Sequence, residues 1–217
     1  MLLLAIDTAT PATTVALVRD GVVLAERSHV DARRHGELLA PLVSAALGDA
    51  GLRMRDVESV AVGIGPGAYT GLRVGLVSAR SMADALGVPV HGVVTLDALA
   101  FASELAGPLV VVTDARRREV FVACYADSTT RTSGPEVTSP DVAVERVAGR
   151  PVVGAGGTPF ADRFGDVRGP DLPAAGALGR LAWRRLAAGD PLPSPDPLYL
   201  RKPDVSVPAG SKPVTPR

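Results

Sequence analysis

Three apolar runs separated by short polar turns open the chain. The first covers residues 2–9 with Asp7 near its end, and residues 13–19 and 22–29 form the next two. The dipeptide Asp20-Gly21 between the second and third runs is typical of a tight hairpin, because glycine readily takes the positive φ that such a turn needs. The pattern predicts a three-stranded meander.

A helical pattern follows the meander. Apolar residues between positions 34 and 50 recur at spacings of three and four, and Gly51 stops the pattern. An apolar strand at 57–64 leads into a glycine-rich turn at 65–69, after which Thr70 can cap a helix that runs to Leu86. A short strand at 90–94 and a helix at 96–105 complete the order β-β-β-α-β-α-β-α.

The second half begins the same plan again. An apolar strand at 109–113 ends at Asp114, and a strand at 119–126 pairs with it through the turn at 115–118. Asp7 and Asp114 hold equivalent strand ends, which indicates two α/β lobes made by duplication. After Ser128 the pattern weakens to polar turns at 129–133, a short strand at 151–155 and a helix at 174–188.

These segments divide the chain into three parts. Residues 1–106 form an N-terminal lobe, residues 107–204 a reduced C-terminal lobe, and residues 205–217 a proline-rich tail that we expect to be disordered. The stretch from Gly189 carries no periodicity and is predicted to be extended or disordered.

Composition narrows the possible roles. The formal net charge is zero, so the chain has no overall attraction for a polyanion, and any tRNA contact is expected to be indirect. The start MLLLAID is too short for a membrane span or a signal peptide, which predicts a cytoplasmic protein without membrane contact. Cys124 is the single cysteine and is expected to be a buried thiol.

The run Gly63–Gly75 is the most informative stretch. A glycine-rich turn before a helix could hold a phosphate, because free N–H groups and the helix dipole attract anions. The run lacks the Lys-Ser/Thr of a Walker loop. We therefore favour the second interpretation, in which Gly65 and Gly67 serve a tight strand-to-helix turn.

The helix after this turn has two faces without charge. Its small residues fall four positions apart, which stacks them along one stripe, and the neighbouring face is apolar. The stripe consists of Gly71, Gly75, Ala79 and Ala83, and the apolar face of Leu72, Leu76, Met82 and Leu86. A helix buried against its own sheet and a helix in a subunit contact both fit this pattern.

Six segments together resemble the TsaB (YeaZ) family. They are AIDTAT, RRHGELLAPLV, GPGAYTGLRVGL, GVVTLDALA, TDARRREVFVACY and, near the end, LYLR. The resemblance covers residues 1–126 well and the remainder in outline. It implies the actin-like fold of sugar kinases and heat-shock ATPases, also called RNase H-like.

The resemblance also implies an accessory role. TsaB-like proteins bind TsaD, work with TsaE, and support formation of N6-threonylcarbamoyladenosine next to the anticodon in tRNAs that read codons starting with A. ATP or ADP and zinc or iron would be ligands of that complex through its partners, with none bound by this chain alone. Isolated copies are expected to form homodimers.

Family likeness places the partner contact on the helices at 34–50 and 70–86. The residues predicted for it, with TsaD or a second copy, are His35, Leu38, Leu42, Leu72, Arg73, Leu76 and Ala79. Taken alone, His35 could be an acid-base or recognition residue, but we favour a solvated residue at the helix start.

No catalytic or metal-binding residue is predicted. TsaD-type metal binding needs two histidines four positions apart, and Thr95 and Leu99 stand at those positions. Asp7 and Asp114 match the strand-end carboxylates that organise magnesium and phosphate in kinases of this fold, and we interpret them as a vestigial cleft. A free-standing nucleotide-binding, kinase-like enzyme remains the alternative, and a metallopeptidase is the least favoured one.

Overall fold

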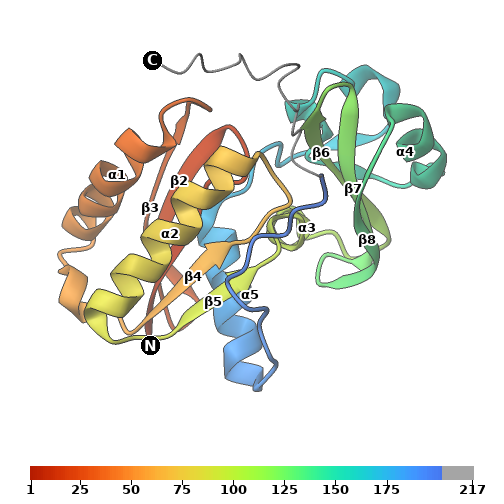
Figure 1. Ribbon diagram of the computed structural model, residues 1–217. Coiled ribbons are helices and arrows are strands. Elements are labelled where there is room, and N and C mark those ends of the chain that lie inside the picture. The colour runs from red at the N-terminus through yellow and green to blue at the C-terminus, as the bar shows by residue number, and fades with distance from the viewer. Residues whose placement is uncertain (202–217) are drawn as a thin grey trace, which may run out of the picture.

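Two five-stranded mixed sheets organise the protein (Figure 1). The computed structural model describes residues 1–201 of the chain. The first sheet has the order β3-β2-β1-β4-β5, in which β1 pairs antiparallel with β2 and parallel with β4. Its strands are β1 Leu2–Asp7, β2 Ala12–Arg19, β3 Val22–Val30, β4 Ser59–Gly63 and β5 Val90–Val93. The predicted meander is confirmed.

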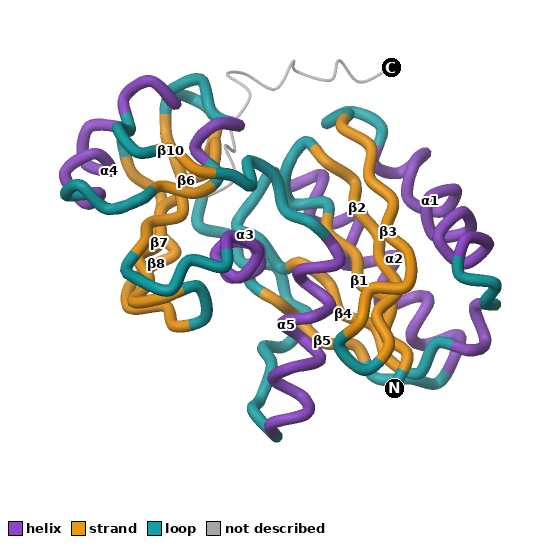
Figure 2. Tube along the Cα trace, turned by 180° about the vertical axis from the view of Figure 1, so that it is seen from behind, coloured by secondary structure: helices purple, strands orange, loops and turns teal. Residues whose placement is uncertain are grey.

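Helices cover both faces of the first sheet. Helices α1 His35–Asp49 and α2 Tyr69–Leu86 lie on one face, and α5 Ala175–Ala188 crosses the other, as the view from behind shows (Figure 2). Strand β1 is buried on both sides: Leu4 and Ile6 join the core under α1 and α2, whereas Leu3 joins the core under α5. Because successive strand residues point to opposite faces, such a strand is apolar throughout.

The second sheet repeats the plan of the first. Its order, taken from β8, is β8-β7-β6-β9-β10, again two antiparallel pairs followed by two parallel pairs. Its strands are β6 Leu109–Arg116, β7 Glu119–Asp127, β8 Thr130–Thr138, β9 Val152–Val153 and β10 Val167–Arg168. Helix α4 Pro140–Val147 has 8 residues where α1 has 15, and short 3-10 turns at Ala155–Gly157 and Ala161–Arg163 take the place of α2. The predicted duplication with a reduced second lobe is confirmed.

Each lobe ends in a helix that packs on the other lobe. Helix α3 Thr95–Ser103 follows the first sheet but contacts β6, β7 and β9 of the second, whereas α5 contacts β1, β2 and β3. Residues Leu178 and Leu181 of α5 are buried against the first sheet. Helix α5 falls in the range 107–204 predicted for the second lobe but packs on the first sheet. A single boundary in the sequence therefore does not separate the residues of the two lobes.

A buried carboxylate joins the crossing helices to the second sheet. Asp97 of α3 accepts a hydrogen bond of 2.9 Å from the Tyr125 hydroxyl of β7. The guanidinium groups of Arg131 on β8 and Arg185 on α5 each lie 3.5 Å from its oxygens. Burial is the first cause that raises the pKa of Tyr125 well above its usual value, followed by the nearby charge of Asp97. The network therefore ties four elements from both lobes together.

Two local predictions are wrong, and one helix was not predicted. Residues 130–133, predicted as polar turns, belong to edge strand β8, whose exposed side chains lack the apolar alternation of a strand, whereas Thr129 does lie in a turn. Helix α4, capped by the Ser139 hydroxyl, has no counterpart among the predicted elements. The N-cap of α2 is Ala68, and no side chain caps this helix, so the predicted cap at Thr70 is incorrect.

The segment after α5 runs along the first lobe to the second, as the dark blue trace in Figure 1 shows. Gly92 N donates to Pro193 O at 2.9 Å, and Leu198 N donates to Ile64 O at 2.8 Å. Arg201 Nη1 donates to Ala115 O of β6 at 3.0 Å. The extended conformation predicted after Gly189 is confirmed up to Arg201, while the predicted disorder of 205–217 lies outside the described residues.

Candidate functional site

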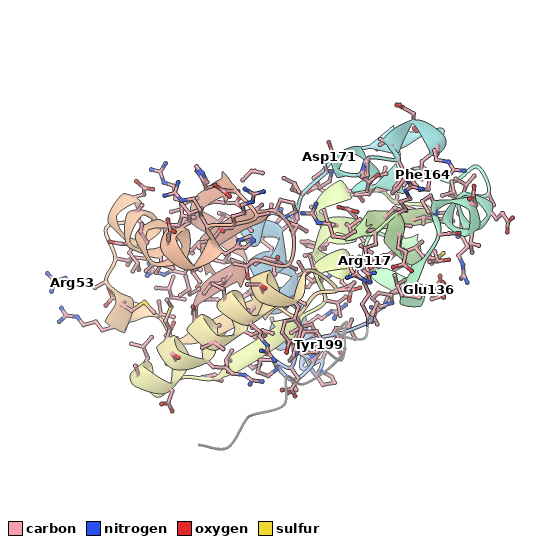
Figure 3. All side chains as sticks on the ribbon, turned by 45° about the horizontal axis from the view of Figure 1, so that its top comes forward. Arg53, Arg117, Glu136, Phe164, Asp171 and Tyr199 are labelled. Atoms are coloured by element: carbon pink, nitrogen blue, oxygen red, sulfur yellow. The ribbon has the colours of Figure 1, made fainter. Side chains whose placement is uncertain are left out.

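A cleft of about 420 Å³ separates the two lobes. The first lobe contributes the β1–β2 connection and the first turn of α2, and the second lobe contributes the end of β6 and the loop at 154–157. The C-terminal segment contributes Tyr199 and Arg201. Figure 3 labels Tyr199 on this segment and Asp171, which also lines the cleft, on the second lobe.

Glycine is required at two positions of the turn before α2. Gly65 has φ +96°, a conformation that side chains with a Cβ rarely adopt. A Cβ at Gly67 would overlap the carbonyl group of Ala9. The prediction that Gly65 and Gly67 serve a tight strand-to-helix turn is therefore confirmed, whereas these contacts leave open whether the helix start binds an anion.

The small-residue stripe of α2 packs within the chain. A Cβ at Gly75 would overlap the Thr8 hydroxyl, which accepts a 3.0 Å hydrogen bond from Gly75 N and donates at 2.7 Å to Gly71 O. Ala79 and Ala83 are buried in the same core. Of the two arrangements compatible with the stripe, the structure has the one in which the helix approaches its own sheet closely.

Asp7 is enclosed and does not line the cleft. Its Oδ1 accepts from Ala9 N at 2.8 Å and its Oδ2 from the Thr95 hydroxyl at 2.7 Å. A Cβ at Gly63 would overlap this carboxyl group, so the site is closed on that side as well. Burial raises the pKa of Asp7 to about 6, against the lowering effect of these two hydrogen bonds. The expectation that Asp7 faces a cleft is corrected.

Replacing Asp7 by Asn is expected to change how stability depends on pH. The folded pKa of about 6 exceeds the ordinary value of 3.8, so the wild-type protein loses stability as pH rises from about 4 to about 6 and then levels off. The neutral amide avoids this loss. The difference in unfolding free energy between Asp7→Asn and wild type should increase, in favour of the variant, by up to about 3 kcal/mol from pH 4 to pH 7.

Urea unfolding of both proteins at each pH measures this difference, and comparison with wild type cancels the other titrating groups. The Asn side-chain oxygen can still accept from Ala9 N, which preserves the local turn. A difference that stays constant from pH 4 to pH 7 would contradict the burial of an ionisable Asp7.

Asp114 does line the cleft. Its Oδ1 accepts from Arg116 N at 2.9 Å, and its Oδ2 lies 3.5 Å from the Arg116 guanidinium. The three arginines at 116–118 all have positive φ between 52° and 63°. Of the two strand-end carboxylates, therefore, only Asp114 faces the cleft, and it does so beside an arginine.

His35 is buried rather than solvated, which corrects the favoured interpretation of this residue. Its side chain is 6% exposed, and Nδ1 lies 2.7 Å from the Thr13 hydroxyl of β2. Burial lowers the pKa of His35, an effect that the nearby charge of Asp31 opposes. His35 lines the cleft at the start of α1 instead of facing outward on the helix.

The predicted partner residues divide into core and surface. Leu72, Leu76 and Ala79 are at most 3% exposed because α2 turns this side toward β1 and β4, so a partner cannot touch them. Leu38 and Leu42 are half-buried, and Arg73 is exposed. The predicted surface is corrected accordingly: the outward side of α2 includes Arg73 and Val77, the latter 62% exposed.

An aromatic cluster at the start of α2 is missing from the predicted site. The rings of Tyr69 and Tyr199 stack with centroids 4.9 Å apart, and the Arg73 guanidinium lies 3.9 Å above the Tyr69 ring. Arg73 Nε also donates to the Tyr199 hydroxyl at 3.2 Å. The only sequence signal is the LYLR segment, because residues 130 positions apart share no periodicity.

The positions matched to the TsaD-type histidines hold structural residues. Thr95 and Leu99 are both fully buried; the Thr95 hydroxyl binds Asp7 and accepts from Gly65 N, and Leu99 lies in the core. Across residues 1–201, no three His, Cys, Asp or Glu side chains gather in a way that could hold a metal ion. No helix in that range is both long and apolar enough to cross a membrane.

Comparisons with known proteins agree with this architecture. The family model of TsaD, tRNA N6-adenosine threonylcarbamoyltransferase, matches residues 22–151. The tRNA threonylcarbamoyladenosine biosynthesis protein TsaB of Escherichia coli is 34% identical over 223 residues, covering 93% of this chain and 95% of that protein. An uncharacterized protein of Mycobacterium tuberculosis is 48% identical over 205 residues, covering 93% and 92%.

A solved structure is also similar. YeaZ from Pseudomonas aeruginosa superposes with a TM-score of 0.77 at 31% identity, covering 92% of this chain and 99% of that one. The shared class is a two-lobed, actin-like α/β protein. The chain belongs to the TsaB (YeaZ) family of tRNA threonylcarbamoyladenosine biosynthesis proteins.

Proposed function

We propose that this chain is a non-catalytic accessory subunit that binds the TsaD protein of its own organism. The observation that carries the proposal is the outward side of α2, where Val77 is 62% exposed although it lies in the middle of the helix. The half-buried Leu38 and Leu42 lie on α1, which contacts α2 on the same face of the sheet. Val77 lies between the exposed Arg73 and Arg80 on this side of α2, and arginine beside an exposed apolar residue is common in protein interfaces.

The enclosure of Asp7 supports the non-catalytic part of the proposal. In kinases of this fold the corresponding carboxylate must reach the ligand, whereas both oxygens of Asp7 are hydrogen-bonded inside the chain. Thr95, which stands where TsaD has a metal-binding histidine, donates a hydrogen bond to Asp7 and so stabilises the fold instead of binding a metal. We do not assign a reaction to the cleft on the strength of Asp114 alone.

The proposed assembly acts in the cytoplasm and includes TsaD and TsaE. ATP or ADP and zinc or iron are bound through these partners, and tRNA contacts this chain indirectly. In the absence of TsaD, two copies of the chain associate through the same helix face. This use of one face for two partners is expected because Val77 remains exposed in the monomer.

Co-purification of the chain with TsaD and TsaE, followed by tRNA modification assays, tests the proposal. We expect a stable heterodimer with TsaD and modification that falls to background when this chain is omitted. The chain alone should give no modification. Full-rate modification by TsaD and TsaE without it, or the failure of a heterodimer to form, would sink the proposed role.

A further inference from the structure

The first turn of α2 offers free hydrogen-bond donors to the cleft. The backbone N–H groups of Tyr69, Thr70 and Gly71 begin the helix, and within residues 1–201 none of them has a protein acceptor. Ala68 at the N-cap has no side-chain oxygen that could serve them. All three residues line the cleft. A helix start of this kind attracts negative charge through its N–H groups and its dipole.

His35 adds an independent donor at the same place. The Thr13 hydroxyl is completely buried, and its single partner in the described chain is Nδ1 of His35, at 2.7 Å. A buried hydroxyl hydrogen requires an acceptor, so we assign this hydrogen to a bond with Nδ1. The neutral ring must then carry its own hydrogen on Nε2.

Nε2 of His35 has no acceptor within residues 1–201, although the side chain is only 6% exposed. This atom borders the first turn of α2, because a Cβ built on Gly71 would lie 3.3 Å from it. Both residues line the cleft. The His35 N–H, which opens on the cleft, and three helix N–H groups are thus grouped at one end of the cavity, and none of them has an acceptor within residues 1–201.

We propose that this end of the cleft binds an oxyanion, namely the phosphate or carboxylate group of a small molecule. The convergent donors are what such a group needs, and a cavity of about 420 Å³ can hold a small ligand beyond it. The site is separate from the outward side of α2, so the inference does not rest on the proposed function.

The other charges around the cleft limit the ligand to one anionic group. Arg116 and Arg201 bring positive charge, but Asp114 pairs with Arg116, and Arg201 lies 3.2 Å from Glu119. Asp171 also lines the cleft from the second lobe (Figure 3). A polyphosphate would extend toward these carboxylates, whereas a single oxyanion at α2 would not.

Titration of the ¹⁵N-labelled full chain with sodium phosphate or sodium acetate tests the site, with sodium chloride of equal ionic strength as the reference. We expect saturable NMR shifts confined to the amides of Tyr69, Thr70 and Gly71 and to the His35 ring. Tighter binding of phosphate or of acetate tells which group the natural ligand carries. Small shifts over the whole surface, without saturation, would overturn the proposal.

Two further measurements separate binding from folding. His35→Gln should weaken phosphate or acetate binding about tenfold, because a hydrogen-bond donor to a charged group is lost. His91→Gln replaces a half-buried histidine that does not line the cleft, and it should leave binding unchanged. Equal binding by wild type and both variants would contradict the role of His35.

If His35→Gln does not fold, the wild-type histidine provides the test. A bound anion favours the charged imidazolium, so saturating phosphate should raise the pKa of His35 in an NMR pH titration. The chain's own charges near the ring, Asp31 and those lining the cleft, are the same with and without phosphate. An unchanged pKa at saturating phosphate would overturn the assignment.

Discussion

Replacing Leu72 by Ala is expected to destabilise the isolated chain by about 2–5 kcal/mol, which lowers Tm by roughly 5–20 °C. Leu72 is fully buried in the core between α2 and the first sheet, where its side chain meets the turn at Gly65. Truncation leaves a cavity that close-packed neighbours cannot fill completely. Thermal and urea unfolding of the monomer measure the effect.

Leu42→Ala is the matched control for this change. Leu42 has the same side chain and was predicted for the same interface, but it is half-buried on α1. Its truncation should cost clearly less, because less apolar surface leaves water on folding. If Leu72→Ala melts like wild type while losing partner binding, Leu72 is an interface residue and its placement in the core is wrong.

Replacing Val77 by Arg is expected to weaken the complex with TsaD at least tenfold while leaving the fold intact. Val77 is 62% exposed at the centre of the outward side of α2, so an arginine there meets water in the monomer. In a complex the same arginine would bring an unpaired charge into an apolar contact. Isothermal titration calorimetry with purified TsaD measures the change in Kd, and a tenfold change corresponds to about 1.4 kcal/mol of binding free energy.

Val142→Arg supplies the control for an added charge. Val142 is an exposed valine on α4 of the second lobe, 39% exposed and away from α1 and α2. This variant should bind TsaD like the wild-type chain. Circular dichroism of both variants should match wild type, and so should Tm at a protein concentration low enough for the chain to be monomeric. Equal affinity of Val77→Arg and Val142→Arg would move the partner surface away from α2.

Local sequence patterns were sufficient for most elements. The meander, α1, α2 and the order of elements along the first lobe follow from apolar runs and from spacings of three and four, which depend on neighbours along the chain. Strand β8 was missed because it lies at a sheet edge, where side chains such as Arg131 and Thr132 need no apolar alternation. Strand β8 pairs with β7 through backbone hydrogen bonds, and these cannot be predicted from the residue types of β8.

The candidate site was predicted only in part. Asp114 was expected at a cleft and is there, because both strand-end positions follow from the duplicated plan. The sequence does not determine which side of α2 faces the sheet, because both Leu72 and Val77 are apolar residues of this helix. The contact between Gly75 and the Thr8 hydroxyl decides which side faces the sheet.

The sequence by itself determined the order of elements, the duplication of the lobes, the turn at Gly65 and the family. The order of elements and the duplication follow from the spacing of apolar residues. The turn follows from glycine, because residues with a Cβ rarely adopt the backbone conformation found at Gly65. Only the tertiary structure decided that Asp7 is sealed by Thr95, that His35 turns toward the cleft, and that Tyr199 returns to Tyr69. The reason is physical. Asp7 and Thr95 are 88 positions apart and are joined by a hydrogen bond, whereas Tyr69 and Tyr199 are 130 positions apart and are joined by ring stacking. A local sequence pattern does not contain contacts over such distances.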